Sequence, residues 1–361
     1  MLKRSFYLHK LIQERDNRAL KLIRGIKGSG KSTLLSLLYE ELRKEEVSVG
    51  VGLFASSDLD SARTFLESQK GGAILLIDDI DRLDDVVIAE FMGRASLYGT
   101  CSSLLCFSAM GESKVICFPL YPLSYSEYCC LYRDGLYMKD TLAEYENALA
   151  MMPAKYNIGS SFSDFYFYMD MLQSLKNQLK KVYGIDRLDS DKTMKLLADN
   201  IGRILSVDDI AFKSRLQKKT IEAVINVLKD ANLLVQINGY DERTDELIEG
   251  GAKFYFTDNY FIKTLRRGKA LPLIKENIAA IELLRRYDGV YYGVESDFII
   301  FDDGEKKIYQ ILSEDDDFSS RLDTLMAIDC SHRCLIAENI SCSVSEGMEI
   351  MDMKTFLLKR K

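Results

Sequence analysis

The stretch that decides the fold is Gly25-Ile26-Lys27-Gly28-Ser29-Gly30-Lys31-Ser32, which fits the pattern G-x-x-x-x-G-K-[ST] in full. The apolar run Ala19–Arg24 precedes it and predicts a short strand. Residues Ser32–Arg43 follow with leucines at helical spacing and predict an amphipathic helix. A strand, a glycine-rich loop and a helix in this order predict a P-loop, which is an element that binds phosphate groups.

The residue types of this loop suit a nucleoside triphosphate with its Mg²⁺ ion. Glycines at positions 25, 28 and 30 let backbone N–H groups turn toward a phosphate without a clash of Cβ atoms. Lys31 can bridge the β- and γ-phosphates, and the Ser32 hydroxyl can bind Mg²⁺. We therefore predict bound ATP and Mg²⁺. The predicted nucleotide-binding residues are Gly25, Gly28, Ser29, Gly30, Lys31, Ser32 and Thr33.

A carboxylate pair after a second strand completes this prediction. The apolar run Ala73–Ile77 predicts a buried parallel strand, and Asp78 and Asp79 follow at its carboxyl end, where open α/β sheets bind ligands. Asp78 is the predicted Mg²⁺ partner. Asp79 is the predicted catalytic carboxylate, together with Lys31. Because Asp is one methylene shorter than the Glu usual at this position, and a displacement of ~1 Å can cost about a hundredfold in rate, we expect slow hydrolysis.

Further strands are expected at Val47–Phe54, Ser102–Ser108 and Lys114–Leu120. Ser108 ends the second of these and is a candidate catalytic residue, because its hydroxyl could sense the γ-phosphate. A serine in a turn at the strand end is the alternative, and both interpretations stay open.

Other polar residues nearby favour ordinary surface roles. Arg94 lies on the intervening helix and is expected to be a surface arginine rather than an arginine finger toward a neighbouring subunit. Asp81, Asp84 and Asp85 are expected to form a solvated helix start rather than a ligand set.

Composition excludes several classes of protein. The chain has 361 residues, 47% of them hydrophobic and 29% charged, as in globular proteins. No stretch reaches ~18 uninterrupted apolar residues, so we expect a cytoplasmic protein without a membrane segment. The formal net charge of −7 disfavours attraction of nucleic acid by the molecule as a whole. Two His residues make a histidine-built metal site improbable, and the 8 Cys residues are expected to be reduced and buried.

The order and spacing of several motifs resemble a widespread group of bacterial and archaeal AAA+-type P-loop ATPases, in which an AAA domain precedes a C-terminal domain of unknown function. The matching pieces are Arg4-x-x-Tyr7-Leu8-x-x-Leu11, GIKGSGKSTLL, LLIDDID, Pro122-Leu123-Ser124-Tyr125-x-Glu127-Tyr128, Leu197-Ala198-Asp199-Asn200-Ile201-Gly202 with Ser206, Lys253-Phe254-Tyr255-Phe256-x-Asp258-Asn259, Glu276-Asn277 with Glu282-Leu283, Glu295-x-Asp297-Phe298, and Tyr309-Gln310. The resemblance covers nearly the whole chain.

Together, these observations predict an α/β protein with a parallel sheet and four parts. We expect an AAA+-type P-loop ATPase domain at 1–128, a helical lid or connector at 129–192, a winged-helix domain at 193–270 and a small α+β domain at 271–361. The resemblance implies the winged helix and gives the last part a restriction-endonuclease-like fold.

The third part has the pattern of helices followed by a hairpin. Ser206 with Asp209 predicts a capping box at the start of one helix. The wing strands are expected at Val235–Ile237 and Phe254–Phe256, with an acidic tip between them. Arg215, Lys218 and Lys219 are candidates for DNA phosphate contacts, but the acidic tip favours packing or protein contact.

The last part carries an incomplete nuclease pattern. By resemblance, Glu282 and Asp297 match two of the expected acids, but Gln310-Ile311-Leu312 lacks the acid and the lysine of the third element, so we expect an inactive nuclease relative. Residues Glu314–Asp317 are expected to form a solvated loop. Cys330-x-His332-x-Cys334 with Cys342 does not have the spacing of common zinc fingers, which favours a loop with reduced thiols.

Two functions remain open at this point. The first is a slow ATPase that uses its nucleotide state, ATP or ADP, to reposition the C-terminal parts on a protein or DNA partner. The second is a DNA-associated protein in which nucleotide is mainly a structural ligand. Relatives of the AAA type often form rings, so a homo-oligomer is compatible with both.

Overall fold

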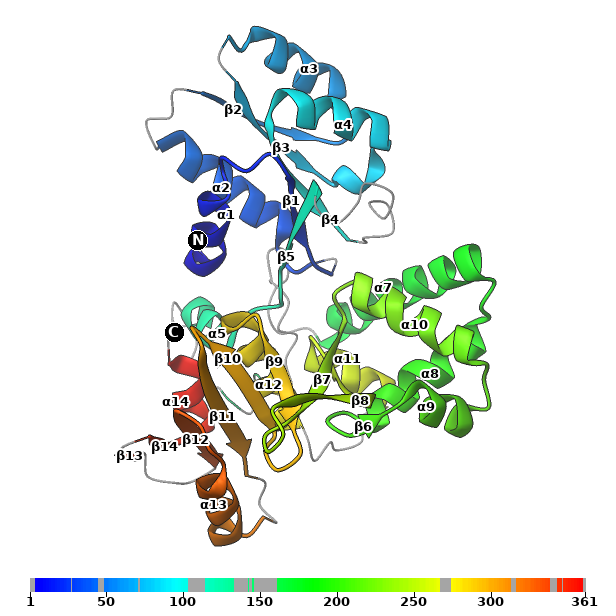
Figure 1. Ribbon diagram of the computed structural model, residues 1–361. Coiled ribbons are helices and arrows are strands. Elements are labelled where there is room, and N and C mark those ends of the chain that lie inside the picture. Colours follow the sequence, from blue (N-terminus) through cyan, green and yellow to red (C-terminus); the bar gives the residue numbers. More distant parts are fainter. Residues whose placement is uncertain are drawn as a thin grey trace. The chain divides into compact units, whose positions relative to one another are not determined.

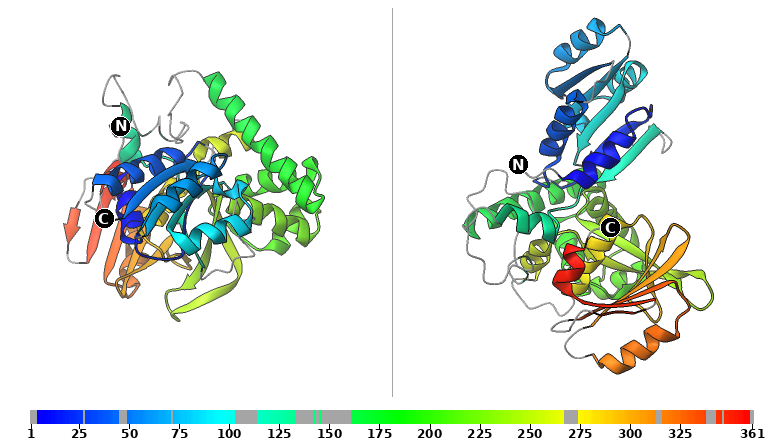
Figure 2. Two further views of the ribbon diagram at one scale, coloured as in Figure 1. Left: turned by 90° about the horizontal axis from the view of Figure 1, so that it is seen from above. Right: turned by 90° about the vertical axis from the view of Figure 1, so that its left-hand side faces the viewer.

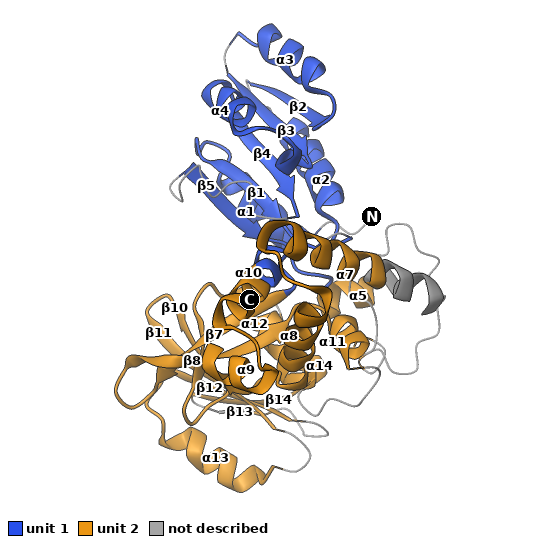
Figure 3. Cartoon of the chain, turned by 90° about the vertical axis from the view of Figure 1, so that its right-hand side faces the viewer, with its two compact units in different colours: residues 1–123, 151–160, 227–233 blue, residues 124–150, 161–226, 234–361 orange. Residues whose placement is uncertain are grey.

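The computed structural model places the chain in two compact units (Figures 1, 2 and 3). It describes residues 4–26, 28–44, 49–70, 72–102, 114–132, 142, 145, 161–266, 274–312, 316–337, 343–345 and 347–359. The first unit comprises Met1–Leu123, Met151–Ser160 and Val227–Leu233, and the second comprises Ser124–Ala150, Ser161–Asn226 and Leu234–Lys361.

The first unit is built on a parallel sheet of five strands in the order β2-β3-β4-β1-β5. The strands are β1 (Leu20–Arg24), β2 (Gly50–Ala55), β3 (Ala73–Asp78), β4 (Ser96–Cys101) and β5 (Val115–Pro119). Helices cover both faces, which explains why β1 and β3 read as continuous apolar runs. The predicted α/β class with a parallel sheet is confirmed.

Alternate residues of each strand reach opposite faces of this sheet and so build two cores. On one face, Leu76 packs with residues of α1 (Ser5–Gln13) and α2 (Lys31–Lys44). On the other, Leu75 packs with residues of α3 (Leu59–Ser68) and α4 (Asp85–Arg94). A short 3₁₀ helix, Ile80–Arg82, connects β3 to α4. Strand β1 lies inside the sheet between β4 and β5, and the glycine-rich loop leaves its carboxyl end.

The second unit contains a mixed sheet of nine strands in the order β13-β14-β12-β11-β10-β9-β7-β8-β6. The strands are β6 (Ile204–Leu205), β7 (Leu234–Asp241), β8 (Glu246–Phe256), β9 (Val290–Gly293), β10 (Phe298–Asp302), β11 (Glu305–Ile311), β12 (His332–Ala337), β13 (Ser343–Ser345) and β14 (Met348–Asp352). The helices are α5 (Tyr125–Tyr132), α7 (Ser161–Tyr183), α8 (Arg187–Asp199), α9 (Val207–Ser214), α10 (Lys218–Asp230), α11 (Asn259–Leu265), α12 (Ile274–Arg286), α13 (Phe318–Ala327) and α14 (Met353–Leu358). Residues 227–230 of α10 belong to the first unit.

A parallel pairing of β7 with β9 joins the β7–β8 hairpin to the C-terminal strands. Gly239 lies opposite Tyr292 and Tyr240 opposite Gly293 in this pairing. One sheet therefore runs across the predicted division between residues 270 and 271. The winged-helix and endonuclease-like assignments stay predictions.

One strand is additional to those predicted, and the hairpin is longer than predicted. The strand that follows β3 is β4 at Ser96–Cys101, while residues 103–108 of the predicted strand Ser102–Ser108 lie outside the described residues. Its sequence SLYGTC is less apolar than the following SLLCFS, so hydrophobicity favoured the later segment. The hairpin strands also extend much further than the predicted wing, and the acidic stretch lies mostly within β8, with the turn only at residues 242–245.

Other predictions are confirmed. The predicted strands at Ala19–Arg24 and Ala73–Ile77 match β1 and β3, and the predicted helix Ser32–Arg43 matches α2. The predicted capping box is present, because the Ser206 hydroxyl accepts from the Asp209 N–H while the Asp209 carboxylate accepts from the Ser206 N–H.

A buried carboxylate at the hairpin turn fixes the turn to the loop between β9 and β10. Glu242 accepts hydrogen bonds from the N–H groups of Val294 (2.9 Å), Glu295 (3.3 Å) and Ser296 (3.0 Å) and from the Ser296 hydroxyl (2.6 Å). Buried donors that lose such an acceptor are costly, at about 1–3 kcal/mol each.

This arrangement predicts that Glu242→Ala lowers the free energy of unfolding of the second unit by at least about 2 kcal/mol, because several N–H donors lose their acceptor. Urea unfolding followed by tyrosine fluorescence measures the change. Glu246→Ala, at an exposed position of the same hairpin, is the matched control and should shift stability by less than about 0.5 kcal/mol. Equal unfolding curves for the two variants would contradict the role given to Glu242.

Candidate functional site

The glycine-rich loop has the backbone geometry that its sequence predicts. Gly28 and Gly30 have φ angles of 86° and 91°, a region that side chains with a Cβ rarely adopt. Gly25 is required for a different reason, because a Cβ there would lie 2.7 Å from the Leu120 carbonyl oxygen and 2.6 Å from Ser29 Oγ. Lys27 lies outside the described residues.

The Lys31 side chain is buried and turns back into the loop. Its Nζ donates to the carbonyl oxygens of Gly25 (2.9 Å) and Ile26 (3.2 Å). Burial lowers the pKa of this ammonium group, and the nearby carboxylates of Asp78, Asp79 and Asp81 act against that shift. A positive charge is thus held inside the loop by weak, neutral acceptors, which phosphate oxygens could replace.

The predicted metal-binding pair is brought together at the carboxyl end of β3. The Ser32 hydroxyl donates to Asp78 Oδ1 at 3.0 Å. Thr100 at the end of β4 donates to the same oxygen at 2.5 Å and accepts from the Asp79 N–H at 2.8 Å. A hydroxyl and a carboxylate are hard oxygen ligands of the kind that Mg²⁺ prefers.

The arrangement is not a complete protein cage for a metal. Within the described part of the chain, no three His, Cys, Asp or Glu side chains are grouped so that they could hold a metal ion. Mg²⁺ in nucleotide sites usually keeps several waters and takes one or two carboxylates together with phosphate oxygens.

Asp79 has a left-handed backbone conformation, with φ 55°. Its carboxylate forms an ion pair with Arg82 Nη2 at 3.0 Å, and the side chain is 41% exposed. Its catalytic role stays a prediction.

Sequence reasoning missed one polar residue at this edge of the sheet and misjudged another. Thr100 was missed because its strand, β4, was not predicted from the sequence. Asp81 was expected to be solvated, and this is wrong: its Oδ2 accepts from the Ser102 N–H at 3.1 Å, and burial raises its pKa, to which the neighbouring Asp79 adds. Asp84 and Asp85 are exposed, as expected.

The remaining candidate residues add little to the description of the site. Ser108 lies outside the described residues, as do Glu314 and Cys342. Thr33 is half-buried in the first turn of α2. Arg94 lies 3.9 Å from Glu90 on the same helix, as expected of a surface arginine. Of the candidate DNA contacts, Lys218 forms an ion pair with Asp208, which reduces the charge available for a phosphate backbone.

The acids of the last part are arranged differently from the nuclease expectation. Glu282 is engaged by Arg286 at 2.9 Å and by Arg285 at 3.4 Å. Asp297 Oδ2 accepts from Gln310 Nε2 and from the Ile311 N–H, both at 2.8 Å.

The carboxylate that acts on Asp297 is that of Glu276, not Glu282. Glu276 accepts from Lys253 Nζ (3.0 Å) and from the Tyr255 hydroxyl (2.6 Å). Lys253, Tyr255 and Glu276 are buried and Asp297 is largely buried, so the four side chains form a structural polar cluster.

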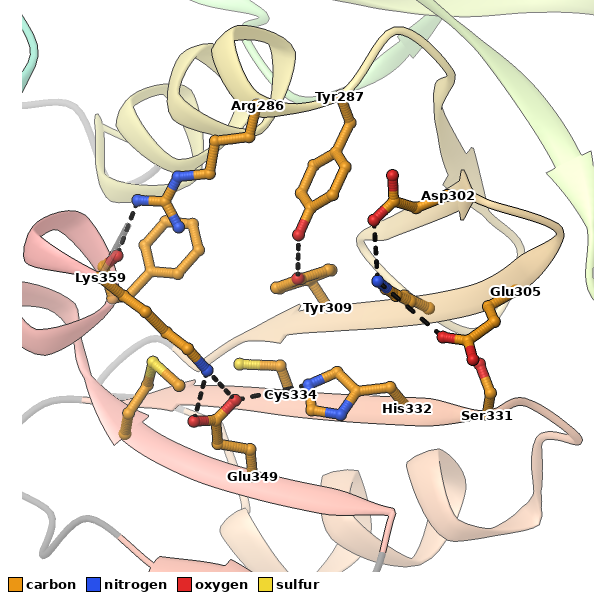
Figure 4. Close-up of a pocket in the computed structure, with 13 residues that line it drawn as sticks. Arg286, Tyr287, Asp302, Glu305, Tyr309, Ser331, His332, Cys334, Glu349 and Lys359 are labelled. Atoms are coloured by element: carbon orange, nitrogen blue, oxygen red, sulfur yellow. Dashed lines mark hydrogen bonds and ion pairs between the residues drawn. The ribbon is translucent and has the colours of Figure 1, made fainter. Parts of the chain in front are cut away.

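A cavity of about 430 Å³ lies on the sheet of the second unit, beside α12 and α14 (Figure 4). Opposite charges are paired at both ends of it: Lys359 with Glu349 at 2.5 Å, and Lys307 with Asp302 at 2.8 Å. Tyr287 and Tyr309 meet through their hydroxyl groups between them, 3.2 Å apart. Each charge is already neutralised by its partner, so the cavity offers no net charge to a ligand.

The segment Cys330-x-His332-x-Cys334 borders this cavity, and its side chains have ordinary structural surroundings. His332 Nε2 lies 3.4 Å from Glu349, and burial lowers the pKa of the imidazole. Cys330 is 3.6 Å from the His332 carbonyl oxygen, and Cys334 is buried. The described cysteines are free thiols, as expected, but Cys117 and Cys130 are exposed, so the expectation of burial is wrong for these two.

Similarity to known proteins is weak. No family model matches the chain. An uncharacterized protein of Haemophilus influenzae is 23% identical over 406 aligned positions, which cover 99% of each chain. Among solved structures, AMPPCP-bound DnaA from Aquifex aeolicus has 13% identity and a TM-score of 0.31, over 61% of this chain and 86% of that chain. Drosophila ORC bound to DNA has 14% identity and a TM-score of 0.25, over 73% and 94%.

TM-scores this low establish neither a shared fold nor a shared activity, so the resemblance to AAA+-type ATPases remains one of sequence motifs. Among the helices in the described ranges, none is long and apolar enough to cross a membrane.

The buried Asp297 makes a pH dependence testable. Burial, reinforced by Glu276, raises the pKa of Asp297 from 3.8 to about 7. The folded state therefore keeps a proton that the unfolded chain loses above about pH 4, so the contribution of Asp297 to stability falls as the pH rises to 7.

We expect Asp297→Asn to remove this loss, worth on the order of 2 kcal/mol between pH 4.5 and 7.5, because the amide oxygen can still accept both hydrogen bonds. Urea unfolding across this pH range measures it. Asp303→Asn, an exposed turn position beyond β10, is the control and should follow the wild-type profile. Parallel profiles for wild type and Asp297→Asn would refute the proton assignment.

Proposed function

We propose that this chain binds ATP with Mg²⁺ at the Gly25–Ser32 loop and hydrolyses it slowly. The observation that carries the proposal is the buried Lys31 ammonium inside the loop, next to the Ser32–Asp78 hydrogen bond at the carboxyl ends of β1 and β3. A lysine, a hydroxyl and a carboxylate on a parallel sheet are the recurring parts of P-loop phosphoryl-transfer sites.

The residues present fit the proposed ligand. Gly25 packs so closely on Leu120 that no side chain could occupy the base of the loop. Ser29 Oγ is buried without a hydrogen-bond partner within the described residues. Ser32 and Asp78 would hold Mg²⁺, while Lys31 and the loop would hold the phosphates. When bound, the ion would neutralise charge on the phosphate oxygens.

The position of Asp79 supports slow turnover. A side chain that orients the attacking water must reach it within hydrogen-bond distance. Asp is shorter than Glu, and Arg82 holds its carboxylate. Both features would leave binding intact while reducing the rate of hydrolysis.

We further propose that the nucleotide state changes the arrangement of the C-terminal parts, to act on a partner whose identity the site does not reveal. Residues 227–233, which end α10 and follow it, belong to the first unit. Asn232 Nδ2 donates to the carbonyl oxygen of Leu120 at 3.2 Å, directly beneath Gly25. A change in loop shape would therefore act on the end of a helix whose first part belongs to the second unit.

The binding proposal predicts that Lys31→Ala weakens the affinity for labelled ATP by at least about tenfold, because one charge pair with phosphate at an effective dielectric near 20 is worth about 4 kcal/mol. Fluorescence anisotropy titration with Mg²⁺ present measures it. Lys44→Ala, at the exposed end of the same helix, is the matched control and should bind like wild type. Negligible binding by all three proteins would disprove the function.

The proposal of slow hydrolysis predicts that Asp79→Glu leaves the ATP affinity within about twofold and raises turnover, because the longer side chain restores the reach of the carboxylate. Phosphate release under saturating ATP and Mg²⁺ measures turnover, with Asp84→Glu as an exposed control. A wild-type rate above ~10 per second, within the ordinary range of enzymes, would show that Asp79 causes no impairment.

A further inference from the structure

Arg4, ahead of α1, is a buried charged side chain that joins three segments distant in the sequence. Its Nη1 donates to the carbonyl oxygen of Ser29 at 3.0 Å. Its Nη2 donates to the carbonyl oxygens of Tyr121 (2.9 Å) and Pro122 (3.4 Å). The guanidinium carbon lies 4.7 Å from the Tyr7 ring centre, and only 4% of the residue is exposed.

The contact with Ser29 bears directly on the glycine-rich loop. The peptide bond between Ser29 and Gly30 is planar and trans, so its C=O and its N–H point in opposite directions. A carbonyl held by Arg4 therefore directs the Gly30 N–H away from Arg4, to the other side of the loop. Arg4 approaches the loop on the side where the carbonyl groups of Tyr121 and Pro122 lie.

This peptide needs such a constraint because glycine alone does not fix it. Gly30 has a φ of 91°, and a glycine can rotate its peptide plane at little cost. The Gly30 carbonyl accepts from the Leu34 N–H at 2.9 Å, which secures the far side of the residue as the first turn of α2. Only the Ser29–Gly30 peptide remains to be oriented, and Arg4 orients it.

Arg4 also has a strained backbone, with φ 44° and ψ 48°. The left-handed conformation is unfavourable for a residue other than glycine. Helix α1 starts at the next residue, so the guanidinium contacts lie directly before the helix.

We propose that Arg4 is a positioning residue for phosphate binding: by fixing the Ser29 carbonyl, it presets the Gly30 N–H to donate to a phosphate oxygen of the nucleotide. This inference rests on the proposed function and adds to it a residue outside the glycine-rich motif. Because a preset donor lowers the ordering cost of binding, the effect belongs to nucleotide affinity rather than to the hydrolysis step.

The test compares Arg4→Met, Arg4→Lys and Tyr7→Phe with wild type. Tyr7→Phe is the matched control, because it removes the hydroxyl that accepts from the Tyr121 N–H (3.4 Å) in the same region but leaves the ring that Arg4 contacts. We expect Arg4→Met to weaken the affinity for ADP and for ATP by about ten- to a hundredfold, Arg4→Lys by less, and Tyr7→Phe by less than about twofold. Turnover at saturating ATP should change much less than affinity.

A second readout separates positioning from general stability. The ³¹P resonance of the β-phosphate of bound ADP reports its hydrogen bonds, and in Arg4→Lys it should shift toward the value of free ADP, whereas in Tyr7→Phe it should not. Because the Arg4→Lys variant keeps a buried cation, the test relies on it if Arg4→Met does not fold.

The outcomes distinguish the two proposals. Absence of ADP and ATP binding by wild type would reject the proposed function itself. Wild-type binding with unchanged affinity and an unchanged ³¹P resonance in folded Arg4 variants would reject the role of Arg4 alone, and a lowered melting temperature without either change would assign Arg4 to packing.

Discussion

A buried positive charge requires oxygen atoms around it, and Lys31 obtains them from carbonyl groups of its own loop. This constraint shapes the first unit. The loop must curl tightly enough to bring two of its carbonyls to one ammonium group, which requires glycine at the points where the backbone turns and where Leu120 approaches. Neutral carbonyl oxygens compensate a positive charge less well than phosphate oxygens do. Phosphate oxygens would therefore be stronger acceptors for the Lys31 ammonium group than the loop carbonyls are.

The first unit shows which structural features the sequence patterns predict and which features they do not. The strand β1, the loop and α2 could be predicted because local signals agree there: an apolar run, glycines at fixed spacing and helical periodicity. The position of Thr100 could not, because its strand contains polar and small residues and is buried by its neighbours β1 and β3 rather than by its own hydrophobicity. Asp81 was misjudged for a related reason, since its hydrogen-bond donor, the Ser102 N–H, directly follows the unpredicted strand β4.

In the second unit, pairing across long sequence distances limits prediction further. The parallel pairing of β7 with β9 joins residues about fifty positions apart and has no local signal in the sequence. The carboxylate beside Asp297 is likewise a matter of tertiary structure. Glu276 and Glu282 lie six residues apart on α12, and only the positions of Lys253 and Arg286 decide which faces the polar cluster and which is held by arginines.

Several hydrogen bonds of the first unit meet at residues 120–122, the segment that follows β5. The Leu120 N–H donates to the Arg24 carbonyl at 2.6 Å, and the Leu120 carbonyl accepts from Asn232. The next two carbonyls, those of Tyr121 and Pro122, accept from Arg4. The second unit begins at Ser124. These groups are held by Arg24, Asn232 and Arg4, so the segment that follows β5 is fixed at several points within the first unit.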